Sequence, residues 1–373
     1  MKPFQRAESE SDGSSSSALD LAILTVCVER NYDDLRRNIA LIDRLNPGVA
    51  WRLVIIDNST GKDASFTVDD PRVEIRPGVP LDPTKPEDVR YSYHHAEALN
   101  QNVDDLGCRL LLIADPDLFV IYPNWMRDVT QYVLQKRLRF FGVPWHPRWY
   151  TKYRNFPCVH FMLIDLQQVP VDRLDFRPEL VERPSWSKRR QSADRESGIP
   201  AHPGNSNIRT ALMATARKLG WRVLSAVYRA GYPIFSRHLV GSSHDTGWKI
   251  WNDFGRSARV RSEVVLPVVD RDADFTAPSF LTTKMGRLLE ALLPARFRFL
   301  PRRETFIDPA NATGFDTADF WLLAAEMFVW RGRPFAFHLR RHMTDQLKSP
   351  PAQDAEAAVL SRILEGVGSP HRT

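Results

Sequence analysis

Two aspartates separated by a single proline, Asp115-Pro116-Asp117, follow directly on the apolar run Leu110–Ala114. Two hard carboxylates held this close suit a divalent cation, and a cation in turn suits a diphosphate. The same three residues are also typical of a surface turn, because Asp and Pro are common turn residues. The pattern alone therefore leaves a metal site and a simple turn as alternatives.

The run before the two acids predicts the element that positions them. A continuous Leu/Ile segment of this length is typical of a strand that is buried on both faces, as in a parallel sheet. Pro116 cannot donate a hydrogen bond to a neighbouring strand, so we expect the strand to end there. Open α/β sheets bind ligands at the carboxyl edge of their strands, and both acids should lie at that edge.

The chain upstream predicts further strands of the same sheet. Leu21–Val28 reads as a buried strand, residues 32–45 as an amphipathic helix, and residues 51–56 as a second strand. Strand, helix and strand in this order form a right-handed parallel unit. Asp57 ends the second strand, where an acid commonly accepts hydrogen bonds from a base or ribose, or else caps the following turn.

Glycine-rich phosphate loops are missing from the sequence. No Gly-x-Gly-x-x-Gly follows the first predicted strand, and no Walker-type loop occurs anywhere. This argues against a dinucleotide-binding Rossmann domain and against a P-loop kinase. A bound phosphate must then be held mainly by a metal and by scattered side chains.

Composition sets wider limits. A chain of 373 residues, 43% of them hydrophobic, predicts one large α/β domain or two domains. The net charge of +6 favours an anionic partner, with phosphorylated substrates, nucleic acid and acidic lipid as alternatives. The three scattered cysteines form neither a disulfide framework nor a zinc pattern. Residues 1–19 are polar and lack the apolar segment of a secretory signal, so we expect a disordered leader on a cytoplasmic protein.

The order of these motifs resembles the nucleotide-binding half of GT-A fold glycosyltransferases, especially the large inverting family. The resemblance lies in a strand ending in Asp57-Asn58-Ser59, a helix carrying Ala98-Leu99-Asn100, and a strand ending in Asp-x-Asp. It implies an α/β fold with a mainly parallel central sheet flanked by helices. It also implies that Asp57 contacts the nucleotide base, that Asn100 belongs to the substrate-binding residues, and that Asp115 contacts the ribose region.

The resemblance also implies a metal site and a base. Asp117 would bind the metal that bridges the diphosphate, with help from Asp115, and His338 would be the late histidine that many of these enzymes supply. Imidazole is an ordinary ligand for manganese. An acid at the start of a late helix is the general base in related transferases, which points to Asp245. A helix cap is the alternative role for Asp245, and its rivals as the base are Asp165, Asp172 and Asp175.

Residues 140–154 are dense in aromatic rings and cations. Aromatic faces stack on sugars and cations bind phosphates, so Trp145, Lys152 and Arg154 are candidate substrate-binding residues. An aromatic core with a basic rim is the alternative. His160 lies in the next apolar run, which the resemblance places on the acceptor side; a hydrogen-bonded core histidine is the other interpretation.

Coarser features complete the expected layout. We expect a nucleotide-sugar-binding half at residues 20–120, an acceptor-binding half at 121–345 with a polar insertion near 183–207, and a peripheral tail at 346–373. We also expect a helix that starts near His94 with Ser92 as its cap, and an apolar helix over residues 316–330 that ends at Gly332. The basic segment 284–303 reads as a core-packing helix, or alternatively as a surface that rests on anionic lipid.

The sequence thus predicts an enzyme that uses Mn²⁺ or Mg²⁺ and moves a sugar from a nucleoside diphosphate sugar to an acceptor hydroxyl, with inversion. The acceptor would be a carbohydrate or a lipid-linked molecule, as in cell-surface polysaccharide or glycolipid synthesis, and nucleic acid is not expected as a partner. A peripheral contact with an anionic membrane follows from the lipid-surface interpretation. Two alternatives are a nucleotidyltransferase of similar fold and a non-catalytic nucleotide-sugar-binding protein.

Overall fold

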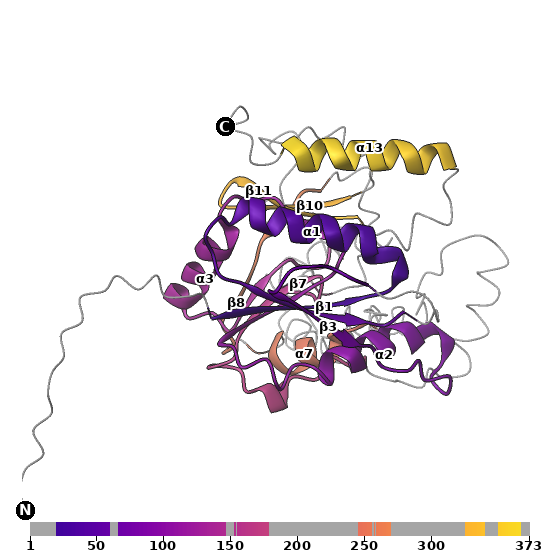
Figure 1. The fold of residues 1–373 in the computed structure, drawn as a ribbon. Coiled ribbons are helices and arrows are strands. Elements are labelled where there is room, and N and C mark those ends of the chain that lie inside the picture. The colour runs from indigo at the N-terminus through magenta and orange to yellow at the C-terminus, as the bar shows by residue number, and fades with distance from the viewer. Residues whose placement is uncertain are drawn as a thin grey trace, which may run out of the picture.

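The computed structural model describes residues 20–59, 66–146, 153, 155–178, 245–255, 257, 259–269, 325–339 and 350–366. In this part of the chain a seven-stranded sheet and a four-stranded sheet pack with helices into one mixed α/β structure (Figure 1). Most neighbouring strands of the large sheet run parallel. This confirms the fold class predicted from the sequence, a mainly parallel central sheet flanked by helices.

Four parallel strands form one half of the large sheet, in the order β3-β2-β1-β4. Their bounds are β1 Leu21–Cys27, β2 Arg52–Asp57, β3 Val73–Pro77 and β4 Leu110–Ala114. The apolar side chains of β1, β2 and β4 are buried on both faces, as continuous Leu/Ile/Val runs predict. Because parallel strands end at a common edge, Asp57 and Asp115 both lie at the carboxyl edge of this half.

The other half of the sheet continues from β4 in the order β7-β6-β8. The bounds are β6 Phe140–Gly142, β7 Phe161–Asp165 and β8 Ser262–Val264. β7 runs antiparallel to β4, with Phe161 opposite Ala114 and Asp165 opposite Leu110. The start of β7 therefore lies beside the end of β4, and His160 is delivered to the same edge as Asp115.

The smaller sheet has the order β5-β11-β10-β9. Its strands are β5 Leu118–Val120, β9 Leu266–Pro267, β10 Glu326–Trp330 and β11 Arg333–His338. The predicted helix over residues 316–330 is wrong for its last five residues, which form β10. Periodicity cannot distinguish a fully buried strand from a buried helix. Arg331 and Gly332, both at positive φ, form a hairpin turn between β10 and β11 rather than a helix end.

Helices cover both faces of the large sheet, with α1 on one face and α2 on the other (Figure 1). The bounds are α1 Tyr32–Leu45, α2 Glu87–Asn100, α3 Trp125–Lys136, α7 Trp248–Ile250 and α13 Pro350–Gly366. A π-helical turn, Trp251–Gly255, extends α7, so a helix follows Asp245.

The starts of two helices differ from the sequence prediction. α2 begins after Pro86, about two turns before His94, so Ser92 lies inside the helix and is not its cap. Pro86 and the acidic Glu87 after it are the start signal, because an acidic residue is favourable in a first helical turn. At α7 the cap position belongs to Gly247, at φ 83°, and Asp245 precedes it.

The C-terminal helix α13 lies alongside the smaller sheet and α1 (Figure 1). Its side chains Val359, Leu360, Ile363 and Leu364 are buried, and Arg44 of α1 donates a hydrogen bond to the carbonyl of Leu364. None of the helices in the described ranges combines the length and the apolar character that crossing a bilayer requires. The predicted leader, the polar insertion and the basic segment 284–303 lie outside these ranges.

Gly142 in β6 sets how closely β6 and β7 approach. A Cβ atom at this position would lie 1.9 Å from the carbonyl oxygen of Phe161. We expect Gly142→Ala to lower the free energy of unfolding by about 3 kcal/mol, near the upper end of the cost of overpacking. Urea unfolding followed by circular dichroism measures this value.

Gly332→Ala is the matched control. Gly332 sits at φ 72° with no atom within 4 Å of its Cβ position, so only backbone strain of about 1 kcal/mol is expected. Equal losses in the two variants would contradict the role of close packing at Gly142.

Candidate metal centre at the edge of the sheet

The Asp115-Pro116-Asp117 segment is a tight turn between β4 and β5. The backbone N–H of Leu118 donates to the carbonyl of Asp115 at 3.2 Å. Asn38 of α1 donates to the carbonyls of Pro116 and Leu118, at 2.8 and 3.0 Å. The turn proposed from the sequence is therefore present, and a helix distant in sequence holds it in position. A turn and a metal site are compatible here, because the turn presents both carboxylates.

His338 reaches Asp117 from the smaller sheet. It is the last residue of β11, lies opposite Leu118 of β5, and is 2% exposed. Its Nε2 atom lies 3.1 Å from Asp117 Oδ1, and its Nδ1 atom lies 3.2 Å from Oε2 of the fully buried Glu326. A buried carboxylate is costly without a partner, so the contact with the His338 ring accounts for the burial of Glu326. Glu326 in turn orients that ring.

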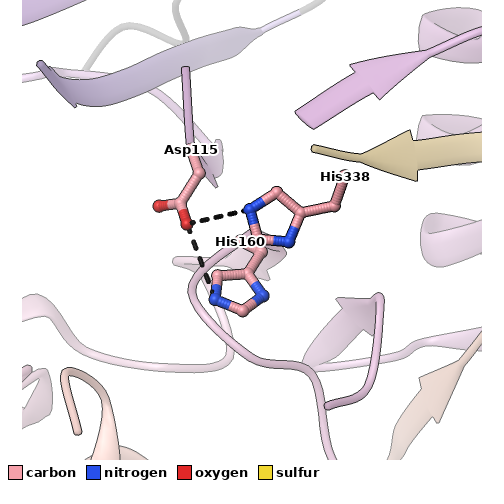
Figure 2. Close-up of side chains that lie close together, drawn as sticks. All are labelled: Asp115, His160 and His338. Atoms are coloured by element: carbon pink, nitrogen blue, oxygen red, sulfur yellow. Dashed lines mark ion pairs between the residues drawn. The ribbon is translucent and has the colours of Figure 1, made fainter. Parts of the chain in front are cut away.

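His160 reaches Asp115 from the start of β7. Its Nε2 atom lies 3.6 Å from Asp115 Oδ2, and its Nδ1 atom lies 3.2 Å from the sulfur of Cys158. The Trp145 ring packs against the imidazole in a T-shaped arrangement at a centroid distance of 4.5 Å. Figure 2 shows one oxygen of the Asp115 carboxylate facing both the His160 and the His338 ring, whose centroids are 4.3 Å apart.

These side chains form a group that fits a divalent cation. One ligand atom from each of Asp115, His160 and His338 lies within 4.8 Å of the others. Asp117 lies outside this group of three, and its carboxylate contacts the Nε2 atom of His338. Imidazole nitrogens and carboxylate oxygens are ligands of Mn²⁺ and of other first-row divalent ions, so the donor set suits the cofactor expected from the sequence. The structure thus brings together the three predicted metal ligands and His160.

Asp57 occupies the same edge at the end of β2. Its carboxylate accepts hydrogen bonds from the Tyr32 hydroxyl at 2.7 Å, from the Ser59 N–H and hydroxyl at 3.0 and 2.6 Å, and from the Phe66 N–H at 3.0 Å. Burial acts to raise the pKa of Asp57, but these donors outweigh it and hold the pKa below its ordinary value. The turn-capping role is therefore present, and contact with a nucleotide base stays a prediction.

The pKa values of groups next to Asp57 are shifted in the opposite direction. Burial, reinforced by the Asp57 charge, raises the pKa of the Cys27 thiol. Burial also raises the pKa of Tyr32 to about 12. Both groups are therefore protonated at neutral pH, and the Tyr32 hydroxyl remains a donor to Asp57.

Asn100 belongs to a polar network on the α2 side of the sheet. Its side chain donates to Asp175 at 3.3 Å and accepts from the Phe176 N–H at 3.0 Å. Asp175 also accepts from Arg177 and from Lys249 of α7, both at 2.8 Å, and these partners hold its pKa below its ordinary value against the effect of burial. The network links α2 to the α7 segment.

Asp245 lies just before α7, where the chain packs against the segment that leads to His160. The Thr246 hydroxyl donates to the Ser92 carbonyl at 3.0 Å, and the Gly247 N–H donates to the Phe176 carbonyl. A Cβ atom on Gly247 would lie 2.8 Å from Val159. Asp245 is half-buried there, and its role as the base stays a prediction.

The other acids considered as the general base, Asp165, Asp172 and Asp175, lie in different surroundings. Asp165 lies opposite Leu110, at the far end of β4 from Asp115, and accepts hydrogen bonds from Gln167 and Gln168. Asp172 is exposed in a short 3-10 turn, and Asp175 lies in the network with Lys249. Lys152 and Arg154 lie outside the part of the chain that the structure describes, so their roles stay predictions.

Three contributors to the centre are missed by sequence reasoning. Glu326 falls in the segment that the sequence predicts as a helix, and Cys158 reads as a small core residue. His95 of α2 is partly buried near enough to Asp117 to interact with its charge. Burial, helped by His94, lowers the pKa of His95 to about 4 even though Asp117 acts in the opposite direction, so His95 is neutral at pH 7. The adjacent histidines His94 and His95 are the sequence feature that could have pointed to His95.

Comparison with known proteins gives partial likenesses of fold. No protein-family model matches the sequence, and no curated protein matches it. Among solved structures, the galactosyltransferase LgtC with donor and acceptor sugar analogues is 12% identical with a TM-score of 0.31, over 48% of this chain and 66% of that one. The mannosyltransferase Ktr4p from S. cerevisiae is 11% identical with a TM-score of 0.30, over 44% of this chain and 61% of that one. The chain thus spans less than two thirds of either protein.

The Asn38 contacts generate a prediction about the turn. Asn38→Ala removes the donor to two carbonyls, so we expect a loss of about 1–2 kcal/mol in unfolding free energy. Mn²⁺ affinity, measured by isothermal titration calorimetry, should also fall about 10-fold, as for residues that orient metal ligands. Asn102→Ala is the control, because its side chain bonds the Ala98 carbonyl within the α2 end. Unchanged Mn²⁺ affinity in Asn38→Ala would show that α1 does not position the acids.

Proposed function

We propose that the protein is a divalent-metal-dependent glycosyltransferase that moves a sugar from a nucleoside diphosphate sugar to an acceptor hydroxyl with inversion. One observation carries the proposal. Asp115 and Asp117 lie at the carboxyl edge of the parallel half-sheet that also ends in Asp57, and His338 meets them from the smaller sheet. Ligands of open α/β sheets bind at this edge.

The donor would lie along this edge. Asp57, fixed by its hydrogen bonds from Tyr32 and Ser59, would face the nucleoside end. Asp115 and Asp117, fixed by the turn, would hold the cation with His338. When bound, the cation supplies positive charge that stabilises the departing diphosphate. The chain's own contribution is to keep these ligands fixed before the donor arrives, which favours electrostatic stabilisation in the transition state.

Asp245 would act on the acceptor. In an inverting transfer the acceptor oxygen bonds to the sugar carbon as the bond from that carbon to the diphosphate oxygen breaks. The acceptor hydroxyl proton passes to a carboxylate on the side opposite the leaving group. Asp245 comes from a different segment than the metal acids, and the contact of Gly247 with Val159 places that segment next to His160. Cell-surface polysaccharide or glycolipid synthesis would supply such an acceptor.

A panel of sugar nucleotides with Mn²⁺ tests the proposal. We expect at least one donor to raise the melting temperature in the presence of Mn²⁺, and to be slowly hydrolysed to the nucleoside diphosphate and free sugar. EDTA should abolish both effects. Binding without hydrolysis or transfer would favour a non-catalytic nucleotide-sugar-binding protein, and pyrophosphate release from a nucleoside triphosphate and a sugar phosphate would favour a nucleotidyltransferase.

Asp117→Asn should abolish the metal-dependent binding of the nucleoside diphosphate, because an amide removes one negative charge from a site for a hard cation. The matched control is Asp104→Asn, since Asp104 is an exposed acid away from the centre. Calorimetry with the preferred nucleoside diphosphate, with and without Mn²⁺, is the measurement. Wild-type metal-dependent affinity in Asp117→Asn would rule out this ligand assignment.

Asp245→Asn separates the base from a structural role. Asparagine keeps the size and hydrogen-bonding capacity of the side chain but cannot accept the proton, so we expect transfer to fall at least about 100-fold. Donor binding and melting temperature should stay at wild-type values. A variant that still transfers sugar at the wild-type rate would exclude Asp245 as the base, and Asp175→Asn would then be the next variant to assay.

A further inference from the structure

We infer that His160 is a second imidazole ligand of the cation, so that the site binds Mn²⁺ through two ring nitrogens and selects it over Mg²⁺. The sequence alone favoured His160 as a substrate-binding residue. This inference rests on the proposed function for the presence of a cation, but it does not depend on sugar transfer.

The distances around Asp115 are close to those of a metal site. Asp115 Oδ2 lies 3.6 Å from His160 Nε2 and 3.8 Å from His338 Nε2. An octahedral cation about 2.1 Å from each of its ligands separates neighbouring ligands by about 3.0 Å. Both Asp115–imidazole distances exceed that separation by less than about 1 Å, and one ligand atom from each of the three side chains lies within 4.8 Å of the others. One oxygen atom faces both rings, as Figure 2 shows.

In each imidazole the second ring nitrogen, Nδ1, also has a fixed partner. The Nδ1 atom of His338 contacts Glu326 at 3.2 Å, and the Nδ1 atom of His160 contacts the Cys158 sulfur at 3.2 Å. Histidines that bind metals through one ring nitrogen usually engage the other with a fixed partner, which orients the ring. Both rings therefore direct Nε2 toward the acids, that of His160 toward Asp115 and that of His338 toward Asp117 at 3.1 Å and Asp115 at 3.8 Å.

Another buried histidine shows what an ordinary core position looks like. His146 is 1% exposed, and its Nε2 atom bonds the carbonyl of Val268 at 2.8 Å. It lies outside the group of possible metal ligands identified among the described residues. His160 differs because its Nε2 atom faces a carboxylate that a second imidazole also faces.

Two imidazoles change the expected metal preference. Mg²⁺ favours octahedral oxygen ligands and gives up its waters reluctantly. First-row transition ions accept imidazole nitrogen more readily than Mg²⁺ does, although Mn²⁺ binds it most weakly among them. A site with a single imidazole and two carboxylates could hold either ion, whereas a second imidazole shifts the balance toward Mn²⁺.

Pulsed electron paramagnetic resonance on the wild-type protein with Mn²⁺ alone counts the coupled imidazole nitrogens. We expect two imidazoles in the wild type and one in His160→Gln. One imidazole in the wild type would overturn the inference while leaving the metal site of the proposed function intact. Failure of Mn²⁺ to bind at all would instead overturn both. The wild-type count decides the question even if the variant does not fold.

Calorimetric titration tests the selectivity. His160→Gln should weaken Mn²⁺ binding at least about 10-fold and change Mg²⁺ binding by less than about threefold, so that Mg²⁺ competes better than in the wild type. His146→Gln is the matched control and should bind both ions as the wild type does. Equal losses for Mn²⁺ and Mg²⁺ in His160→Gln, or wild-type affinities for both, would contradict a second imidazole ligand.

Discussion

The contact of His338 with Asp117 and Glu326 joins two strands and a turn in the interior of the protein. Glu326 is fully buried, and His338 and Asp117 are 2% and 7% exposed. Buried charged groups are expensive unless they are paired and hydrogen-bonded, so each of these side chains constrains the positions of the other two. Because Glu326 belongs to β10, His338 to β11 and Asp117 to the turn before β5, the contact fixes the smaller sheet against the end of β4.

The topology of the large sheet supplies the other side of the centre. The centre needs Asp115, which follows β4, and His160, which precedes β7, at one edge of the sheet. The two strands are neighbours in the sheet but lie far apart in the sequence. If β7 ran parallel to β4, the carboxyl end of β7 would lie at this edge instead of its first residue. β7 instead runs antiparallel to β4, so its first residue, and His160 before it, lie at that edge. The backbone N–H of Asp115 donates to the His160 carbonyl at 3.0 Å, which extends the pairing to the functional residues themselves.

Contacts from several helices and side chains hold the acids and their neighbours in position. Asn38 of α1 holds the turn, and Trp145 packs on His160. On the α2 side, Asp175 connects Asn100 to Lys249 and so ties α2 to the segment that carries Asp245. Groups fixed in this way lose little freedom when a ligand arrives, which is the property that preorganised binding and catalysis need.

Local sequence determined the strands and the acids at their ends. Continuous apolar runs predicted β1, β2 and β4, and the residues that stop those runs, Asp57 and Asp115-Pro116-Asp117, lie where the strands end. These predictions succeed because a strand buried on both faces needs apolar side chains throughout, and its first polar residue marks its exit from the core. The family resemblance pointed to His338, which ends β11, and its role as a metal ligand stays a prediction.

Tertiary structure alone decided which distant groups meet. The apolar segment ending at Trp330 could have been a helix or a strand, and pairing with β11 made it β10, which brought Glu326 to His338. The sequence likewise could not place the Cys158 sulfur beside His160, since that depends on the antiparallel course of β7. Sequence patterns record whether a residue is buried, whereas the partner of a buried polar group is set by contacts between segments far apart in the chain.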